Sequence, residues 1–164
     1  MTKKIVKTAL LTTLVYIATM IIKIPSPMKG YINVGDCIVL LCGWLLSPGY
    51  GFIAAGLGSA LAEILSGYVT YAPATFLIKG CMALVAFSCF QLLHRGIGKL
   101  RAQMIGGVLA EIVMVGGYFL FEGLLYGFTP SLVNIPANLV QGVAGFIFGV
   151  LLIKIVEKLP INMK

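Results

Sequence analysis

The stretch Ala74–Leu93, ATFLIKGCMALVAFSCFQLL, decides the fold class because it is long and apolar enough to cross a bilayer. A transmembrane helix needs about 20 predominantly apolar residues. The same stretch places a cation, Lys79, inside the span. A cation near the centre of such a helix costs about 2.5–3.5 kcal/mol on insertion scales. A partner or a function must therefore offset that cost, and neighbouring apolar runs offer Glu63, Glu111 and Glu122 as partners.

The rest of the chain has the same apolar character. Of its 164 residues 60% are hydrophobic and only 10% are charged, whereas soluble domains average about 25% charged residues. We expect an all-α integral membrane protein in which residues 1–164 form one compact six-helix domain. The expected helices are Ile5–Ile22, Gly35–Leu46, Tyr50–Ser66, Ala74–Leu93, Ala102–Tyr126 and Pro136–Glu157, separated by segments rich in Pro and Gly. The second of these is short.

The basic residues predict the orientation of the chain. Nine of the twelve fall on one side of the membrane if there are six crossings, namely Lys3, Lys4, Lys7, Arg95, Lys99, Arg101, Lys154, Lys158 and Lys164. The other side holds Lys23 and Lys29, and the region His94–Arg101 is expected to be a loop. The positive-inside rule then places both termini on the cytoplasmic side, as expected for a multi-pass protein of the cell membrane.

Several functional classes lack their sequence signatures. We interpret the net charge of +7 as setting the orientation of the chain in the membrane. Nucleic-acid binding is not favoured, because no basic patch is interleaved with aromatic residues. No phosphate-binding loop is present, so the chain carries no ATPase motif of that kind. The four cysteines have no metal-ligand spacing. We therefore expect no enzyme activity, no cofactor and no metal.

Polar residues inside the spans share helix faces. Glu111, Tyr118 and Glu122 lie on one face of the fifth expected helix, and Asn134, Asn138 and Gln141 lie on one face of the sixth. At about 1.5 Å per residue, Lys79, Glu63, Glu122 and the amides fall at similar depth in the outer half of the membrane, with Glu111 deeper. Four helices thus direct polar side chains to one level.

Tyrosines gather on the same side. Some of them suit an interfacial aromatic belt, but Tyr31, Tyr71 and Tyr118 are also candidates to stack on a flat ring. A cup with stacking rings, amides and one cation suits a small heteroaromatic solute with hydroxyl or acidic substituents.

Three structural interpretations stay open beside the functional ones. Asp36 begins the second expected helix, where a carboxylate accepts bonds from free backbone N–H groups. Lys79 either contacts a ligand or forms a buried ion pair with Glu63 that locks two helices together. On the first helix, Ala9 and Thr13 share one face, which either packs inside the bundle or docks another membrane protein.

The central stretch resembles the substrate-binding S components of energy-coupling factor (ECF) vitamin transporters. The resemblance is carried by four segments within residues 30–85, and the remainder agrees in length and helix count. These segments are Tyr31–Asp36 (YINVGD), Leu45–Gly51 (LLSPGYG), Ala55–Tyr68 (AGLGSALAEILSGY) and Tyr71–Gly80 (YAPATFLIKG). The group that it resembles is the riboflavin-type group, which also includes binders of hydroxymethylpyrimidine and pyridoxine.

The resemblance implies a six-helix subunit with cytoplasmic termini that binds a vitamin near the outer face. Such a subunit associates with a membrane coupling subunit and two ATPase subunits, and topples in the membrane to release the vitamin. The family's AxxxA docking motif on helix one maps onto Ala9–Thr13 (ALLTT), where Thr13 departs from the pattern but remains small.

We therefore expect an S component that binds pyridoxine or hydroxymethylpyrimidine first and riboflavin next. Tyr31 and Asn33 are expected to cap the site, and Tyr71 and Tyr118 to stack on the ligand. The hydrogen-bonding set is expected to be Lys79, Glu122, Asn134, Asn138 and Gln141. The alternatives are a stand-alone carrier or channel, or a small intramembrane lipid-modifying enzyme with Glu111 and Glu122 as its catalytic pair.

Overall fold

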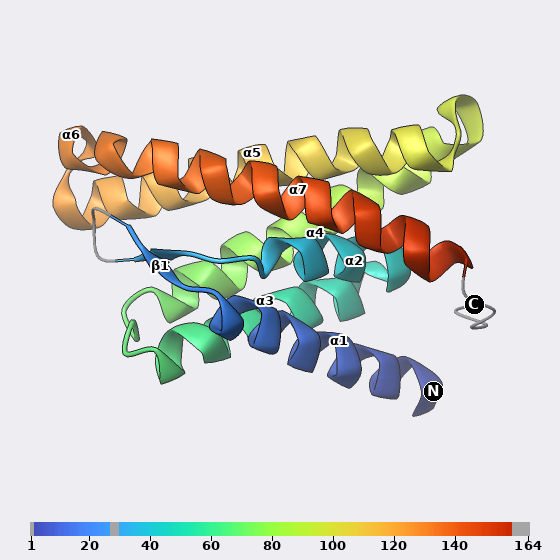
Figure 1. Ribbon diagram of the computed structural model, residues 1–164, viewed down its shortest axis with the longest axis horizontal. Helices are drawn as coiled ribbons and strands as arrows, with labels where there is room; N and C mark the ends of the chain where they lie inside the picture. The colour runs from blue at the N-terminus through green and yellow to red at the C-terminus, as the bar shows by residue number, and fades with distance from the viewer. Residues whose placement is uncertain (1, 27–29, 159–164) are drawn as a thin grey trace.

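The computed structural model describes residues 2–26 and 30–158, and these are mostly helical (Figure 1). The long helices are α1 (Thr2–Ile21), α3 (Pro48–Leu65), α4 (Ala72–Ile97), α5 (Lys99–Tyr126) and α7 (Ile135–Lys158). The shorter elements are β1 (Ile24–Pro25), β2 (Tyr31–Ile32), α2 (Asp36–Leu45), α6 (Phe128–Ser131) and the 3-10 helix η1 (Leu132–Asn134). Strands β1 and β2 pair antiparallel, with Ile24 opposite Ile32.

The expectation of six helices in a membrane bundle is confirmed, with α2 as the short member. Among the described residues, five helical segments are long and apolar enough to cross a membrane: α1, α3, α4, α5 and the run from α6 through α7. Helix α2 has 10 residues, which corresponds to about 15 Å. Large apolar side chains such as Leu92 and Leu124 remain exposed on the outside of the bundle, as lipid contact requires.

The helix ends divide between two ends of the molecule (Figure 1). The terminal end holds the start of α1, the α2–α3 connection, the α4–α5 turn and the end of α7. The loop end holds β1 and β2, the α3–α4 loop, and α6 with η1. All the described basic residues that were expected on one side belong to elements near the terminal end, whereas Lys23 adjoins β1 at the loop end. Lys29 and Lys164 lie outside the described residues.

The region His94–Arg101 is not the loop that the sequence predicted. Helix α4 continues through His94 and Arg95 to Ile97, and Gly98 alone separates it from α5. Gly98 has a φ of 85°, a conformation that glycine adopts at no steric cost. The basic residues in the last turn of α4 also interact favourably with the helix C-terminus, so the helix extends beyond its apolar span.

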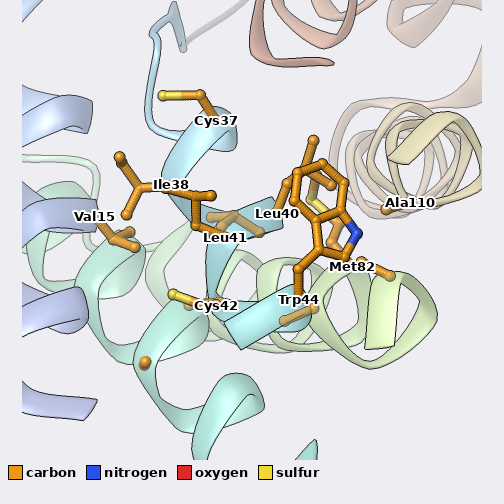
Figure 2. Packing of buried hydrophobic residues seen from close by; sticks show 14 of the residues in the cluster. Val15, Cys37, Ile38, Leu40, Leu41, Cys42, Trp44, Met82 and Ala110 are labelled. Carbon is orange, nitrogen blue, oxygen red and sulfur yellow. The ribbon is translucent and has the colours of Figure 1, made fainter. Parts of the chain in front are cut away.

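Helix α2 forms the centre of the core. Nine of its ten residues, Asp36 to Trp44, are buried, and it packs against α3, α4 and α7. Figure 2 shows Leu40, Cys42 and Trp44 of α2 among Met82 of α4 and Ala110 of α5. Burial on all sides explains why α2 reads as a continuous apolar run.

The start of α2 lies against α7 at a glycine. A Cβ atom at Gly145 would come 2.6 Å from Asp36 Cβ, closer than side-chain atoms pack. Small residues of this kind let helix backbones approach closely in lipid. The close approach of α7 therefore brings its side chains within reach of the carboxylate of Asp36.

Candidate functional site

A polar cavity lies at the loop end of the bundle, where the elements β2, α3, α5, η1 and α7 meet. Its volume is about 30 Å³. We call it the polar cavity; its lining residues are Ser26, Gly30, Tyr31, Asn33, Glu63, Tyr71, Tyr118, Glu122, Asn134, Asn138 and Gln141. Eight of the nine ligand-binding residues that the sequence predicts lie in this lining, and only Lys79 does not.

Lys79 lies behind the lining in an ion pair with Asp36. Its Nζ donates a hydrogen bond to Asp36 Oδ1, and the two side chains are 3% and 0% exposed. The Nζ atom also lies 5.4 Å from the centroid of the Tyr118 ring, within the range of a cation–π contact. The ion-pair partner of Lys79 is therefore Asp36 rather than the expected Glu63.

Gln141 joins this ion pair to the first loop. Its Nε2 donates to Asp36 Oδ2 at 2.8 Å, and its Oε1 accepts from the backbone N and from Nδ2 of Asn33 at 3.0 and 3.2 Å. We call Asn33, Asp36, Lys79 and Gln141 the ion-pair network. The network ties α2, α4, α7 and the segment after β2 together, and it occupies both carboxylate oxygens of Asp36.

The expected role of Asp36 as a helix cap is wrong. Helix α2 has no side-chain cap hydrogen bond, and the Asp36 carboxylate accepts from the Lys79 and Gln141 side chains instead. The backbone before α2 is instead held by Asn33, whose Oδ1 accepts from Gly35 N at 2.9 Å. An Asn side chain that bonds the backbone two residues on is a common way of stabilising a turn.

Tyr118 lies between Lys79 and the polar cavity, which Asn33 and Gln141 of the ion-pair network also line. Its hydroxyl is 3.0 Å from Thr75 Oγ1 of α4, and its side chain is 8% exposed. One part of the ring thus faces Lys79, while the residue also lines the cavity. The contact with Thr75 fixes the orientation of the Tyr118 ring, and a role in stacking on a ligand depends on that orientation.

Glu122 and Asn134 meet across the α5–α7 connection. Asn134 Nδ2 donates to Glu122 Oε1 at 2.6 Å. The chain reverses after α5 at Gly127, which has a φ of 93°, and α6 and η1 return it to the cavity. Glu122 Oε2 and Asn134 Oδ1 are buried and have no hydrogen-bond partner among the described residues. These two acceptors therefore remain available to a ligand.

Aromatic rings cover one side of the cavity. Tyr31 and Tyr68 have ring centroids 5.4 Å apart, and Tyr71 lies edge-on to Phe121 at 5.3 Å. The hydroxyls of Tyr31 and Tyr71 are buried without a partner among the described residues. Burial is the largest cause that raises the pKa of each of these hydroxyls above its usual value, so both stay neutral and able to donate.

Lys23 holds the first loop from outside the cavity. Its Nζ donates to Ser66 Oγ at 2.5 Å and lies 5.2 Å from the centroid of the Tyr31 ring. It is absent from the cavity lining. This contact links the loop before β1 to the end of α3.

The other two carboxyl groups in the spans lie in different places. Glu63 lines the polar cavity from the last turn of α3, so it belongs to the site although the sequence assigned it only a pairing role. Glu111 instead lines a separate apolar groove of about 500 Å³ beside α5 and α7. Because Glu111 and Glu122 line different cavities, the arrangement does not favour a catalytic pair.

The expected docking residues lie on the outer face of α1. Ala9 and Thr13 are exposed, whereas α1 packs inward through Leu11, Val15 and Thr19. The Thr13 hydroxyl donates to Ala9 O at 3.0 Å, so it is satisfied within its own helix. Both residues line a shallow groove of about 400 Å³ between α1 and α3, which leaves them free to contact another protein.

Sequence reasoning missed Ser26 and Gly30 in the lining, and no local pattern marks either of them. It also missed the ion pair between Asp36 and Lys79, whose partners are 43 residues apart. Among the described residues no group of three or more His, Cys, Asp or Glu side chains is placed to hold a metal ion.

Known proteins resemble this chain along almost its whole length. Residues 1–158 match the family model described as "ECF-type riboflavin transporter, S component". An uncharacterized protein of Pyrococcus woesei is 36% identical over 138 residues, which cover 82% of this chain and 88% of that protein. The thiamine precursor transporter HmpT of Lactococcus lactis subsp. cremoris (strain MG1363) is 24% identical over 158 residues, covering 95% and 89%.

A solved structure supports the same fold. It is described as "Structure and mechanism of the S component of a bacterial ECF transporter", and it aligns with a TM-score of 0.76 at 22% identity over 95% of this chain and 96% of that one. At this identity the likeness shows the fold, while the family model shows the membership. The chain therefore belongs to the family of ECF-type riboflavin transporter S components, which are multi-pass proteins of the prokaryotic cell membrane.

Proposed function

We propose that this protein captures a small water-soluble vitamin or vitamin precursor in the polar cavity, as the substrate-binding subunit of an ECF transporter. The observation that carries the proposal is the cavity itself, where buried polar side chains from helices α3, α5 and α7 converge. Buried polar atoms without partners are rare in proteins, and here Glu122 and Asn134, which line the cavity, each carry one among the described residues. A transport subunit of this kind is not an enzyme.

The charge distribution supports an outward-facing cavity. The cavity lies at the loop end, and the described basic residues gather near the terminal end. Basic residues favour the cytoplasmic side. We propose that both termini are cytoplasmic and that the vitamin arrives from outside.

Within the cavity each residue type has a distinct proposed role. Tyr31 and Asn33, in and after β2, cover the ligand. Tyr71 and Tyr118 stack on its ring. Glu122, Asn134 and Asn138 hydrogen-bond it, and Gln141 contributes through the part of its amide that the ion-pair network leaves free.

The cavity must widen to hold such a ligand. Its volume of about 30 Å³ holds only about two or three water molecules, since a cavity needs about 10–15 Å³ to hold one. The first loop reaches α7 through the bonds between Asn33 and Gln141. We propose that vitamin entry moves β2 and Asn33 away from α7, and that the same residues then cover the bound ring.

Pyridoxine or hydroxymethylpyrimidine is the proposed first choice of ligand, with riboflavin next. Short polar side chains at one level suit a compact ring better than a three-ring system. The relative from Lactococcus lactis carries a thiamine precursor according to its name, which supports a small ring.

Transport requires partners, and the groove between α1 and α3 is the proposed docking face. Its exposed Ala9 and Thr13 permit close helix approach. We propose that a membrane coupling subunit binds here, that two ATPase subunits drive the cycle, and that the loaded subunit topples to release the vitamin inside.

Mass spectrometry of ligand released from the purified protein tests the proposal directly. A vitamin or precursor should be released in near-stoichiometric amount, and it should rebind in equilibrium dialysis. Reconstituted uptake should depend on the coupling subunit and on ATP. Uptake by this chain alone would favour a stand-alone carrier instead.

A further inference from the structure

The charged side chains that line the polar cavity are carboxyl groups. Among the described lining residues these are Glu63 of α3 and Glu122 of α5, and no Lys or Arg belongs to the lining. Glu63 and Glu122 are 8% and 2% exposed. Charges of one sign inside a low-dielectric cavity act strongly on a ligand.

The two described lysines nearest in the fold lie outside the cavity lining. Lys79 is held by Asp36 behind Tyr118 and Gln141. Lys23 is bonded to Ser66 outside the cavity. A buried ion that leaves its partner would leave an uncompensated charge behind, so Lys79 is not free to neutralise a bound anion.

The hydrogen-bonding groups without partners are chiefly acceptors. Glu122 Oε2 and Asn134 Oδ1 are acceptors, and the Tyr31 and Tyr71 hydroxyls serve either way. A ligand that donates N–H or O–H groups satisfies these atoms. A ligand that brings only acceptors can pair with the two hydroxyls but leaves Glu122 Oε2 and Asn134 Oδ1 unpaired, which is costly for buried groups.

From these contacts we infer that the polar cavity selects an uncharged or cationic ring with N–H and O–H donors, and rejects anionic forms of the same ring. This inference rests on the proposed function and names the class of its substrate. With a carboxyl group ionised, an anion is repelled. With that group protonated, the described lining still contains no cation to offset the desolvation of an anion.

Matched pairs of ligands that differ in one charge test the inference. Each pair consists of an uncharged compound and its anionic counterpart. The pairs are hydroxymethylpyrimidine and the analogue in which a carboxylate replaces the hydroxymethyl group, pyridoxine and pyridoxic acid, and riboflavin and FMN. The first two pairs hold size nearly constant. Equilibrium dialysis against the full-length protein in nanodiscs should show the uncharged member binding at least about 100-fold more tightly, as expected for like charges at close range in a protein interior.

Variants separate charge from shape. Glu122→Gln keeps the size of the side chain and an acceptor for Asn134 but turns a free acceptor into a donor, so it should reduce the selectivity at least about tenfold. Glu111→Gln makes the same change on the same helix outside the polar cavity, and it should leave the selectivity unchanged. Both proteins are compared with the parent at equal folded fraction, measured by size-exclusion chromatography.

The outcomes distinguish the inference from the proposed function. A carboxylate or phosphate form that binds within about tenfold of its uncharged partner, a difference of no more than about 1.4 kcal/mol, overturns the charge selection while vitamin capture stands. Equal loss of selectivity in the Glu122 and Glu111 variants also overturns it. Failure of all six probes to bind overturns the proposed function together with the inference.

Discussion

The ion-pair network and the polar cavity are built from the same kinds of side chain, yet they differ in whether those side chains have partners. In the network, Lys79 and Gln141 occupy both oxygens of Asp36. In the cavity, Glu122 and Asn134 share one bond and each keeps an unpartnered acceptor. A satisfied polar cluster in a membrane bundle holds helices together, whereas an unsatisfied one is available to a ligand.

Removing the cation of the ion-pair network should cause the largest loss of stability. Lys79→Ala leaves the fully buried carboxylate of Asp36 without its cation, and breaking a buried pair costs about 3–5 kcal/mol. Thermal unfolding in detergent, followed by circular dichroism, should show a marked loss of stability, and ligand affinity should fall with it.

A double variant sharpens that result. Lys79→Met with Asp36→Asn removes both charges, so it should recover most of the stability lost in Lys79→Ala. A Lys79→Ala protein that unfolds at the parent temperature and binds ligand normally would show that the ion pair holds nothing together.

Two polar residues of α7 allow the network to be compared with the cavity on one helix. Gln141 belongs to the ion-pair network as well as to the lining, whereas Asn138 belongs only to the lining. Gln141→Leu removes bonds to Asp36 and Asn33 and should cost about 1–3 kcal/mol of stability. Asn138→Leu should change stability by less than about 0.5 kcal/mol, because its half-buried side chain makes no hydrogen bond with another described side chain, but it should weaken vitamin binding.

Unfolding curves measure the stability of the two variants, and equilibrium dialysis measures their affinity for the vitamin. The comparison between network and cavity breaks if Asn138→Leu destabilises the bundle as much as Gln141→Leu does.

The contact between Thr75 and Tyr118 connects the two regions and should have a smaller effect. Thr75→Val and Tyr118→Phe each remove the hydrogen bond of 3.0 Å, and each should cost about 1 kcal/mol. The double variant should cost no more than either single one, since both remove the same bond. Additive losses in this double-mutant cycle of unfolding free energies would mean that each group acts independently.

Changes on the outer face of α1 should affect neither region. Ala9→Phe with Thr13→Phe fills the groove between α1 and α3 and should block uptake by the complete transporter, while vitamin affinity and stability of the isolated subunit stay within about 0.5 kcal/mol. Val6→Phe, at an exposed position of α1 outside that groove, is the matched control. Loss of vitamin binding in the groove variant would show instead that this face supports the bundle.

Prediction from sequence succeeds here where the physical cause is local. Apolar runs long enough to span a bilayer identify the helices to within a few residues, because the cost of exposing backbone or charge to lipid acts on each segment separately. The shared helix faces of Tyr118 and Glu122 follow from helix periodicity, and the structure places both in one cavity. The extent of α4 beyond Leu93 could not be predicted in this way, because polar residues outside the membrane do not reveal whether they are helical.

By itself, the sequence determined the membrane class, the six helices, the end at which basic residues gather, and most of the side chains that line the cavity. Only the tertiary structure decided that Lys79 pairs with Asp36 rather than Glu63, that Glu63 lines the cavity, and that Glu111 lies elsewhere. The physical reason is that hydropathy and periodicity act within one helix, whereas ion pairing depends on how helices approach. Here the short helix α2 begins beside Gly145, deep enough in the bundle for its first carboxylate to meet a lysine 43 residues away.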